Sequence, residues 1–73
     1  MQFYCYAVIP DESERHELKK TLRHHHIPFT EKCDCRIEVE MECMSYKTVE
    51  RISDAFNAVK HTERGFTVMG DKP

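Results

Sequence analysis

Three consecutive histidines and a nearby Cys-x-Cys pair are the residues of this sequence that most suggest metal chemistry. His24–His26 precede Cys33 and Cys35 by a few positions, and imidazole and thiolate are ligands that suit zinc, copper or nickel. Consecutive side chains on a helix point about 100° apart, so the three histidines cannot all face one ion. Cys33 and Cys35 alternate with charged residues, a strand pattern that directs both sulfurs toward the core. We expect no metal site; zinc-type binding by His24–His26 with Cys33 or Cys35 is the alternative interpretation.

The cysteines could also supply a nucleophile. A catalytic thiol has to be activated in a partly exposed, electropositive place, whereas the alternation predicts that three of the four cysteines point inward beside acidic residues. Without a signal segment, reduced thiols are favoured over disulfides. We therefore expect no catalytic residue, no cofactor and no enzymatic activity. The four cysteines are Cys5, Cys33, Cys35 and Cys43.

Glu38, Glu40 and Glu42 form a charged row that alternates with apolar residues. This alternation is typical of a strand with one face in water, on which successive carboxylates lie roughly 7 Å apart. Exposed carboxylates in such a row solvate the strand far more often than they perform acid–base chemistry. The two glycines of the chain are also too few for a glycine-rich phosphate loop.

Tyr4 and Tyr6 belong to an N-terminal segment, residues 2–9, that is apolar on both faces and stops at Pro10. A strand of this kind is usually central in a sheet and covered on both sides. If helices cover the face that carries Phe3, the two tyrosines lie on the other, open face beside the glutamate row. Aromatic side chains next to a charged row are typical of a recognition surface.

Two helices are expected to position these residues. Asp11 with Glu14 forms a capping pattern at the start of a helix that runs to about His26. Ser45 caps a second helix, in which Met44 and Val49 have the spacing of a hydrophobic staple and Gly65 fits a stop signal. Residues 66–69 then predict a last short strand.

The segment between the helices leaves two arrangements open. Residues 33–43 alternate as a strand, and residues 29–32 either extend that strand or form a short one of their own that turns back around residues 32–34. We favour the hairpin, although no Asn-Gly marks a turn there. The order is then βαββαβ, that of an α+β ferredoxin-like sandwich with an antiparallel sheet and both helices on one face. Without the hairpin, a three-stranded βαβαβ layer results.

The inner face of this sandwich is expected to be apolar throughout. The residues expected on it are Phe3, Cys5, Ala7, Ile9, Leu18, Leu22, Ile37, Val39, Met41, Val49, Ile52, Phe56, Val59, Phe66 and Val68.

The composition fits one small domain over residues 1–73. At 8.7 kDa and 40% hydrophobic residues, the chain buries about 60% of the surface that it exposes when unfolded. Its apolar runs are far shorter than the roughly 20 residues that cross a bilayer, and its start lacks the basic residues of a signal peptide. A net charge of −2 argues against nucleic-acid binding, which needs a concentrated positive surface. We expect a cytoplasmic protein that binds neither membrane nor nucleic acid.

These expectations favour a non-enzymatic interaction module that regulates or inhibits a partner protein through the open face of its sheet. Tyr4 and Tyr6 would anchor the partner, and Glu38, Glu40 and Glu42 would supply electrostatic selectivity. Phages and mobile elements often encode inhibitors of this size, so a viral origin is part of the expectation. Self-association into a homodimer through the same face is the alternative partner. A small enzyme with a site shared between subunits is a third interpretation.

Overall fold

The computed structural model describes residues 2–42 and 45–69 of the chain. Cys43, Met44 and the side chains of Val68 and Met69 lie outside this description, and with them the expectations for those positions. Four strands and two helices follow one another along the described residues. In chain order they are β1 (Gln2–Val8), α1 (Glu12–His24), β2 (Thr30–Glu31), β3 (Arg36–Glu42), α2 (Tyr46–Asn57) and β4 (Glu63–Met69).

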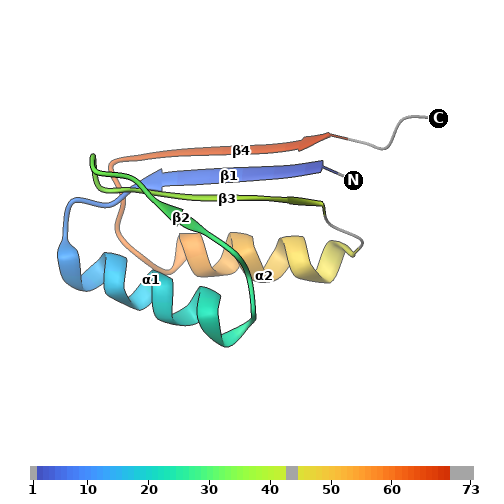
Figure 1. The fold of residues 1–73 in the computed structure, drawn as a ribbon, viewed down its shortest axis with the longest axis horizontal. Helices are drawn as coiled ribbons and strands as arrows, with labels where there is room; N and C mark the ends of the chain where they lie inside the picture. Colours follow the sequence, from blue (N-terminus) through green and yellow to red (C-terminus); the bar gives the residue numbers. More distant parts are fainter. Residues whose placement is uncertain (1, 43–44, 70–73) are drawn as a thin grey trace.

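The four strands form one antiparallel sheet in the order β2-β3-β1-β4, with β1 in its interior. Figure 1 shows both helices on the same side of this sheet. The βαββαβ order and the α+β ferredoxin-like arrangement are therefore confirmed, and the three-stranded alternative is wrong. The interior place of β1 agrees with its apolar residues on both faces.

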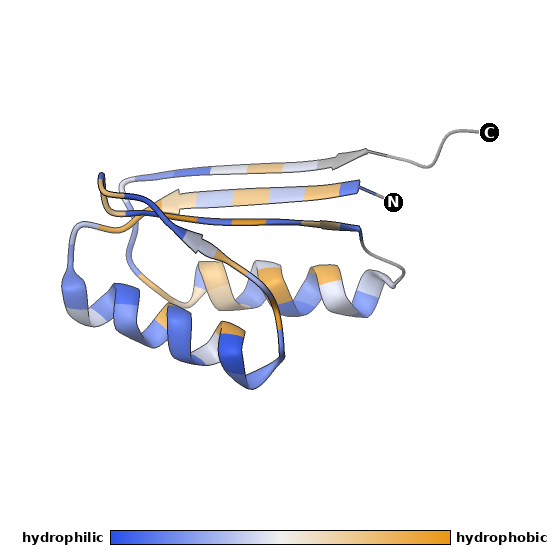
Figure 2. Cartoon of the chain, viewed as in Figure 1, coloured by the Kyte–Doolittle hydropathy of each residue, from blue (hydrophilic) through white to orange (hydrophobic). Residues whose placement is uncertain are grey.

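The core lies between the sheet and the two helices. Figure 2 shows apolar positions alternating with polar ones along the strands, as expected where only one face of a sheet is buried. Met41 packs against this core from its margin, and Phe66 is 45% exposed although it pairs with buried Cys5, because β4 is the outermost strand on that side. The buried hydrophobic residues are Phe3, Cys5, Ala7, Ile9, Leu18, Leu22, Ile27, Ile37, Val39, Val49, Ile52, Ala55, Phe56 and Val59.

Helix α1 begins where the capping pattern predicts and ends two residues earlier than expected. The Asp11 carboxylate accepts hydrogen bonds from the backbone N–H groups of Ser13 and Glu14. At the other end, His26 adopts a left-handed conformation with φ of 59°. Its N–H donates to the Arg23 carbonyl at 3.0 Å, and that of Ile27 donates to the Leu22 carbonyl at 2.9 Å. This is a Schellman motif with histidine where glycine is usual.

The segment after α1 is a hairpin, as favoured, but its turn differs from the predicted one. Strand β3 begins at Arg36 rather than at Cys33, and Cys35 is left-handed with φ of 67°. The turn is closed by Lys32 N–H donating to the Arg36 carbonyl at 2.8 Å, and Ile9 N–H donates to the Cys35 carbonyl at 2.8 Å. The expectation that Cys33 points into the core is wrong, because the residue lies in this turn and is exposed. Cys35 is half-buried.

Helix α2 starts at the predicted cap, where the Ser45 hydroxyl accepts from Lys47 N–H at 3.1 Å. It ends at Asn57, well before Gly65, so the stop predicted there is wrong. Gly65 lies inside β4, which begins at Glu63 rather than at Phe66. The connection between α2 and β4 is tied to α1 by the Lys60 N–H, which donates to the Glu14 carboxylate at 2.8 Å. Of the two helices that the structure describes, neither has the length and apolar character to cross a membrane.

Replacing His26 with glycine should stabilise the fold. Glycine adopts the left-handed conformation without the roughly 1 kcal/mol that a side chain costs there, and this gain exceeds the chain entropy that it adds to the unfolded state. We expect His26→Gly to raise the free energy of unfolding by up to about 1 kcal/mol, measured by urea denaturation. His25→Gly is the control, since His25 has φ of −93°, and it should lower stability. A loss of stability in His26→Gly would contradict this account of the helix end.

Glu31 ties the hairpin to α1 and should make stability depend on pH. Its carboxylate accepts from Lys19 Nζ at 3.0 Å and lies 3.5 Å from Arg15 Nε. The hydrogen bond from Lys19 holds the pKa of Glu31 below its ordinary 4.5. A lowered folded-state pKa gives stability that is present above the unfolded value and lost as pH falls through the folded one.

Because Glu31 is 40% exposed at its side chain, Glu31→Gln should cost only about 0.5 kcal/mol near neutral pH. The difference from the unmodified protein should shrink as pH falls below 4.5 and disappear once the carboxylate is protonated in both states. Thermal unfolding across this range measures it, with Glu17→Gln on the exposed side of α1 as the control. A difference that persists at low pH would show that the ion pairs do not cause it.

Candidate functional site

The open face of the sheet, on the side away from the helices, carries all five residues predicted for partner binding. Strand register pairs Tyr4 with Glu40 and Tyr6 with Glu38 across β1 and β3. It also pairs Gln2 with Glu42, so the glutamate row runs alongside the two tyrosines. Paired residues of adjacent strands share a face, and Phe3, Cys5 and Ala7 are buried on the other one.

Tyr6 is fixed from three sides at the centre of this face. Its hydroxyl donates to the Glu63 carboxylate at 2.8 Å, and the Arg36 guanidinium carbon lies 4.8 Å from its ring centroid. Its ring also covers Gly65, where a Cβ atom would overlap the ring carbons. The Tyr4 ring lies beside it, with centroids 5.9 Å apart. The two rings therefore form an ordered aromatic pair.

The pKa values of both tyrosines are raised above the ordinary one. The hydrogen bond to Glu63 raises the pKa of Tyr6 above its ordinary 10.0. Partial burial, followed by the nearby Glu38 carboxylate, raises the pKa of Tyr4. Tyrosine is uncharged at neutral pH even without such a shift, so both rings offer an apolar surface and an uncharged hydroxyl there.

The three glutamates of the row differ in whether another side chain already contacts their carboxylate. Glu42 accepts from Gln2 Nε2 at 2.8 Å, and Glu38 lies 3.8 Å from Arg36 Nη1. Glu40 is exposed, and no side chain among the described residues hydrogen-bonds or forms an ion pair with it. Its carboxylate is therefore available to a ligand without breaking an internal contact.

Two shallow hollows border Glu40. One, of about 80 Å³, lies between Tyr4 and Glu40 and is completed by Gln2, Phe3 and Thr67. The other, of about 160 Å³, is lined by Glu38 and Glu40 together with the 28–30 segment. A water molecule takes about 30 Å³ in the liquid, so each hollow has the size of the end of one long side chain. Both present a carboxylate and an apolar or aromatic wall.

The structure adds two residues to this surface. Glu63 and Gly65 reach the open face because β4 starts earlier than predicted. Arg36, which strand alternation already places on this face with the glutamates, lies over the Tyr6 ring. Alternation along residues 63–68 could have indicated the longer strand, since odd positions there are polar or small and 66 and 68 are apolar. The stacking of Arg36 on Tyr6 depends on strand register, which the sequence alone did not show.

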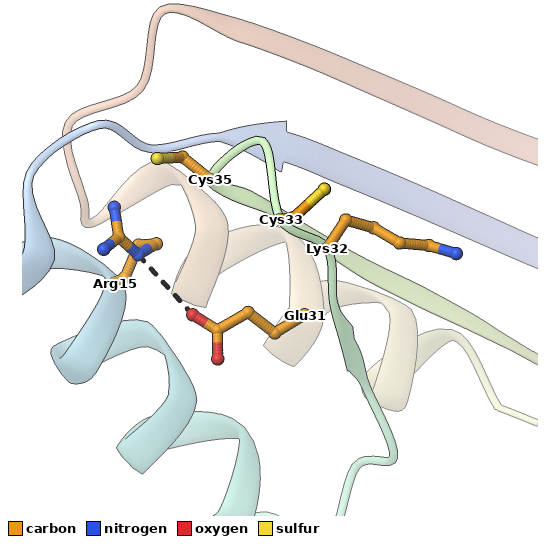
Figure 3. Close-up of a pocket in the computed structure, with 5 residues that line it drawn as sticks. All are labelled: Arg15, Glu31, Lys32, Cys33 and Cys35. Atoms are coloured by element: carbon orange, nitrogen blue, oxygen red, sulfur yellow. Dashed lines mark ion pairs between the residues drawn. The ribbon is translucent and has the colours of Figure 1, made fainter.

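The histidines and cysteines do not converge. His24 and His25 are in edge-to-face contact at 5.1 Å at the end of α1, where their segment ends the helix. Cys33 and Cys35 line an open hollow of about 410 Å³ with Arg15, Glu31 and Lys32, and Figure 3 shows their sulfurs pointing in opposite directions. Within residues 2–42 and 45–69, no three His, Cys, Asp or Glu side chains are grouped as metal ligands.

Cys5 lacks the setting of a nucleophile. It is fully buried in the core, and burial raises the pKa of its thiol. A thiol that stays protonated beneath the sheet cannot meet a substrate.

Comparison with known proteins adds no assignment. The sequence matches no protein-family model and no curated protein. The function therefore has to be inferred from the residues and geometry of the chain itself.

Gly65 should be required for the position of Tyr6. We expect Gly65→Ala to lower Tm by about 4–8 °C, because the added methyl group displaces a ring that Arg36 and Glu63 also hold. In a Tyr6→Ala background the same substitution should be neutral or stabilising, since alanine suits a strand better than glycine. Thermal unfolding of the four proteins in this cycle measures the coupling. Equal effects in both backgrounds would show that the ring does not depend on Gly65.

Proposed function

We propose that this protein is a non-enzymatic binding module that holds a basic surface of a partner protein against the open face of its sheet. The observation that carries the proposal is the aromatic pair Tyr4 and Tyr6 on the interior strand β1. Carboxylates lie on both sides of the pair, and no helix of the described residues covers it. The proposal includes regulation or inhibition of that partner in a cytoplasmic setting, with a viral or mobile-element origin, which rests on the small size of the chain.

The aromatic pair supports binding because it is already ordered. Arg36, Gly65 and Glu63 hold the Tyr6 ring, so little side-chain freedom remains to be lost when a partner packs on it. Tyrosine is enriched among the residues that dominate binding energy, since a large apolar ring carries a polar hydroxyl. The open face therefore offers an anchor at its centre.

The charged side chains of the open face favour a basic partner. Glu38, Glu40, Glu42 and Glu63 surround the tyrosines, and Arg36 is the cation among them. Phosphate groups would be repelled by this arrangement, as would a second copy of the same face. A basic protein surface is attracted, and a lysine or arginine end group fits the 80 Å³ hollow between the Tyr4 ring and the Glu40 carboxylate.

An NMR titration with octa-arginine and octa-glutamate peptides tests the proposal on the intact chain. We expect the cationic peptide alone to shift backbone amides of β1 and β3, because only it complements the carboxylate row. Tyr4→Ala and Glu40→Lys should each weaken binding roughly tenfold, while circular dichroism stays unchanged.

Glu17→Lys is the matched control, because it makes the same charge change on the exposed surface of α1. It should leave the affinity close to that of the unmodified protein. Shifts that gather on α1, or an affinity that depends on net charge wherever the substitution is made, would sink the proposal. Unchanged affinity in Tyr4→Ala would also refute the role of the aromatic pair.

A further inference from the structure

Strand β4 leaves one long edge of the sheet without a neighbour. Its seven residues, Glu63–Met69, pair with β1 on one side, and the described part of the chain places nothing on the other. Figure 1 shows β4 running along the margin of the sheet over nearly the full length of β1. The opposite edge is different, because β2 has only two residues. A long edge exposes a row of backbone donors and acceptors that can pair with another strand.

The devices that usually protect such an edge are missing from β4. The strand holds no proline and no lysine, and residues 65–69 carry no charge. Arg64 is turned onto α2, where Nη2 donates to Ser53 Oγ at 3.1 Å and Nη1 to Asn57 Oδ1. Glu63 is engaged by the Tyr6 hydroxyl. Because their side chains already have partners within the chain, neither Glu63 nor Arg64 projects from the edge to repel a second strand.

Phe66 occupies the middle of this edge. It packs edge-to-face on Phe3, with ring centroids 5.1 Å apart, and is still 45% exposed. It is one of two large hydrophobic residues that the described structure leaves exposed; the other, Tyr46, begins α2. An exposed aromatic ring at the centre of an unprotected edge marks that edge as a contact surface.

We infer that β4 pairs with β4 of a second copy of this chain, antiparallel and centred on Phe66. In this register position 66 faces itself, 65 faces 67, 64 faces 68 and 63 faces 69. Glu63 and Arg64 then lie opposite uncharged positions, so no like charges meet across the new pair. A second copy of the strand therefore fits this edge without a charge clash, and the interface is a two-fold one.

The resulting dimer has a definite architecture. Antiparallel pairing about a two-fold axis perpendicular to the sheet joins the two sheets into one and keeps all helices on the same side. The two open faces then adjoin each other on the other side. This inference does not depend on the proposed binding function, because the β4 edge and the Tyr4–Tyr6 pair are different surfaces.

Sedimentation velocity over a concentration series tests the pairing. We expect the unmodified protein to dimerise below about 1 mM, and Phe66→Lys and Phe66→Glu each to be monomeric, because like charges would meet on the axis. An equimolar mixture of the two variants should restore a dimer, since position 66 then joins opposite charges. Tyr46→Lys, at a residue 74% exposed elsewhere, is the control and should dimerise normally.

A monomer at every concentration, or a Phe66→Lys variant that still dimerises, would overturn the inference. Amide exchange of the unmodified protein provides a test that needs no variant to fold. Protection in β4 should rise with concentration while that of the Thr30 and Glu31 amides stays constant; no change in β4 would again contradict the pairing. Tyr4→Ala should leave the dimer intact, so failure of the binding proposal and failure of this one are distinguishable.

Discussion

The rest of this structure depends on the position of β1 between two antiparallel neighbours. Its odd-numbered residues are all but fully buried under the helices, whereas its even-numbered residues emerge on the opposite side, where the topology places no helix. A strand that is apolar on both faces normally has a covering layer on each. Here one layer is missing among the described residues, and two tyrosines stand where it would pack. The candidate binding surface is therefore a direct consequence of where the central strand lies.

Two arginines on opposite faces of the sheet set the character of each surface. Arg36 stacks on Tyr6 on the open face, and Arg64 lies near Phe56 and Phe66 on the helix side. Each guanidinium lies over an aromatic ring and also contacts polar groups of its own chain, so neither projects as a free cation. The Nε atom of each is nevertheless buried without a hydrogen-bond partner among the described residues. The open face therefore has more carboxylates than cations. The edge of β4 has no free charged side chain that would repel a second strand. Both proposed surfaces thus follow from where these two cations are placed.

Other features that attract attention in the sequence have structural roles. The histidine run ends α1, because His26 takes the left-handed position of a Schellman motif and lets Ile27 reach the core. Cys35 performs a similar task in the hairpin turn, where its positive φ directs its carbonyl to Ile9 N–H. His26 and Cys35, which resemble metal ligands in the sequence, both adopt the left-handed backbone conformation that a helix end and a tight turn require here.

The sequence by itself determined the order of the elements, both helix starts and nearly the whole core, because caps and hydrophobic periodicity act over a few residues. It also indicated the open face, since Tyr4, Tyr6 and the glutamate row follow strand alternation. Tertiary structure decided what depends on distant pairing. The turn at residues 32–35 needs a cysteine in the left-handed conformation, where the sequence has no glycine to indicate it. Gly65 belongs to a strand because β4 pairs with β1, and the Tyr6 ring lies where a Cβ atom of residue 65 would be. Strand order and register join residues that are far apart in the chain. They decide that Arg36 and Glu63 both contact Tyr6, and that Phe66 is exposed.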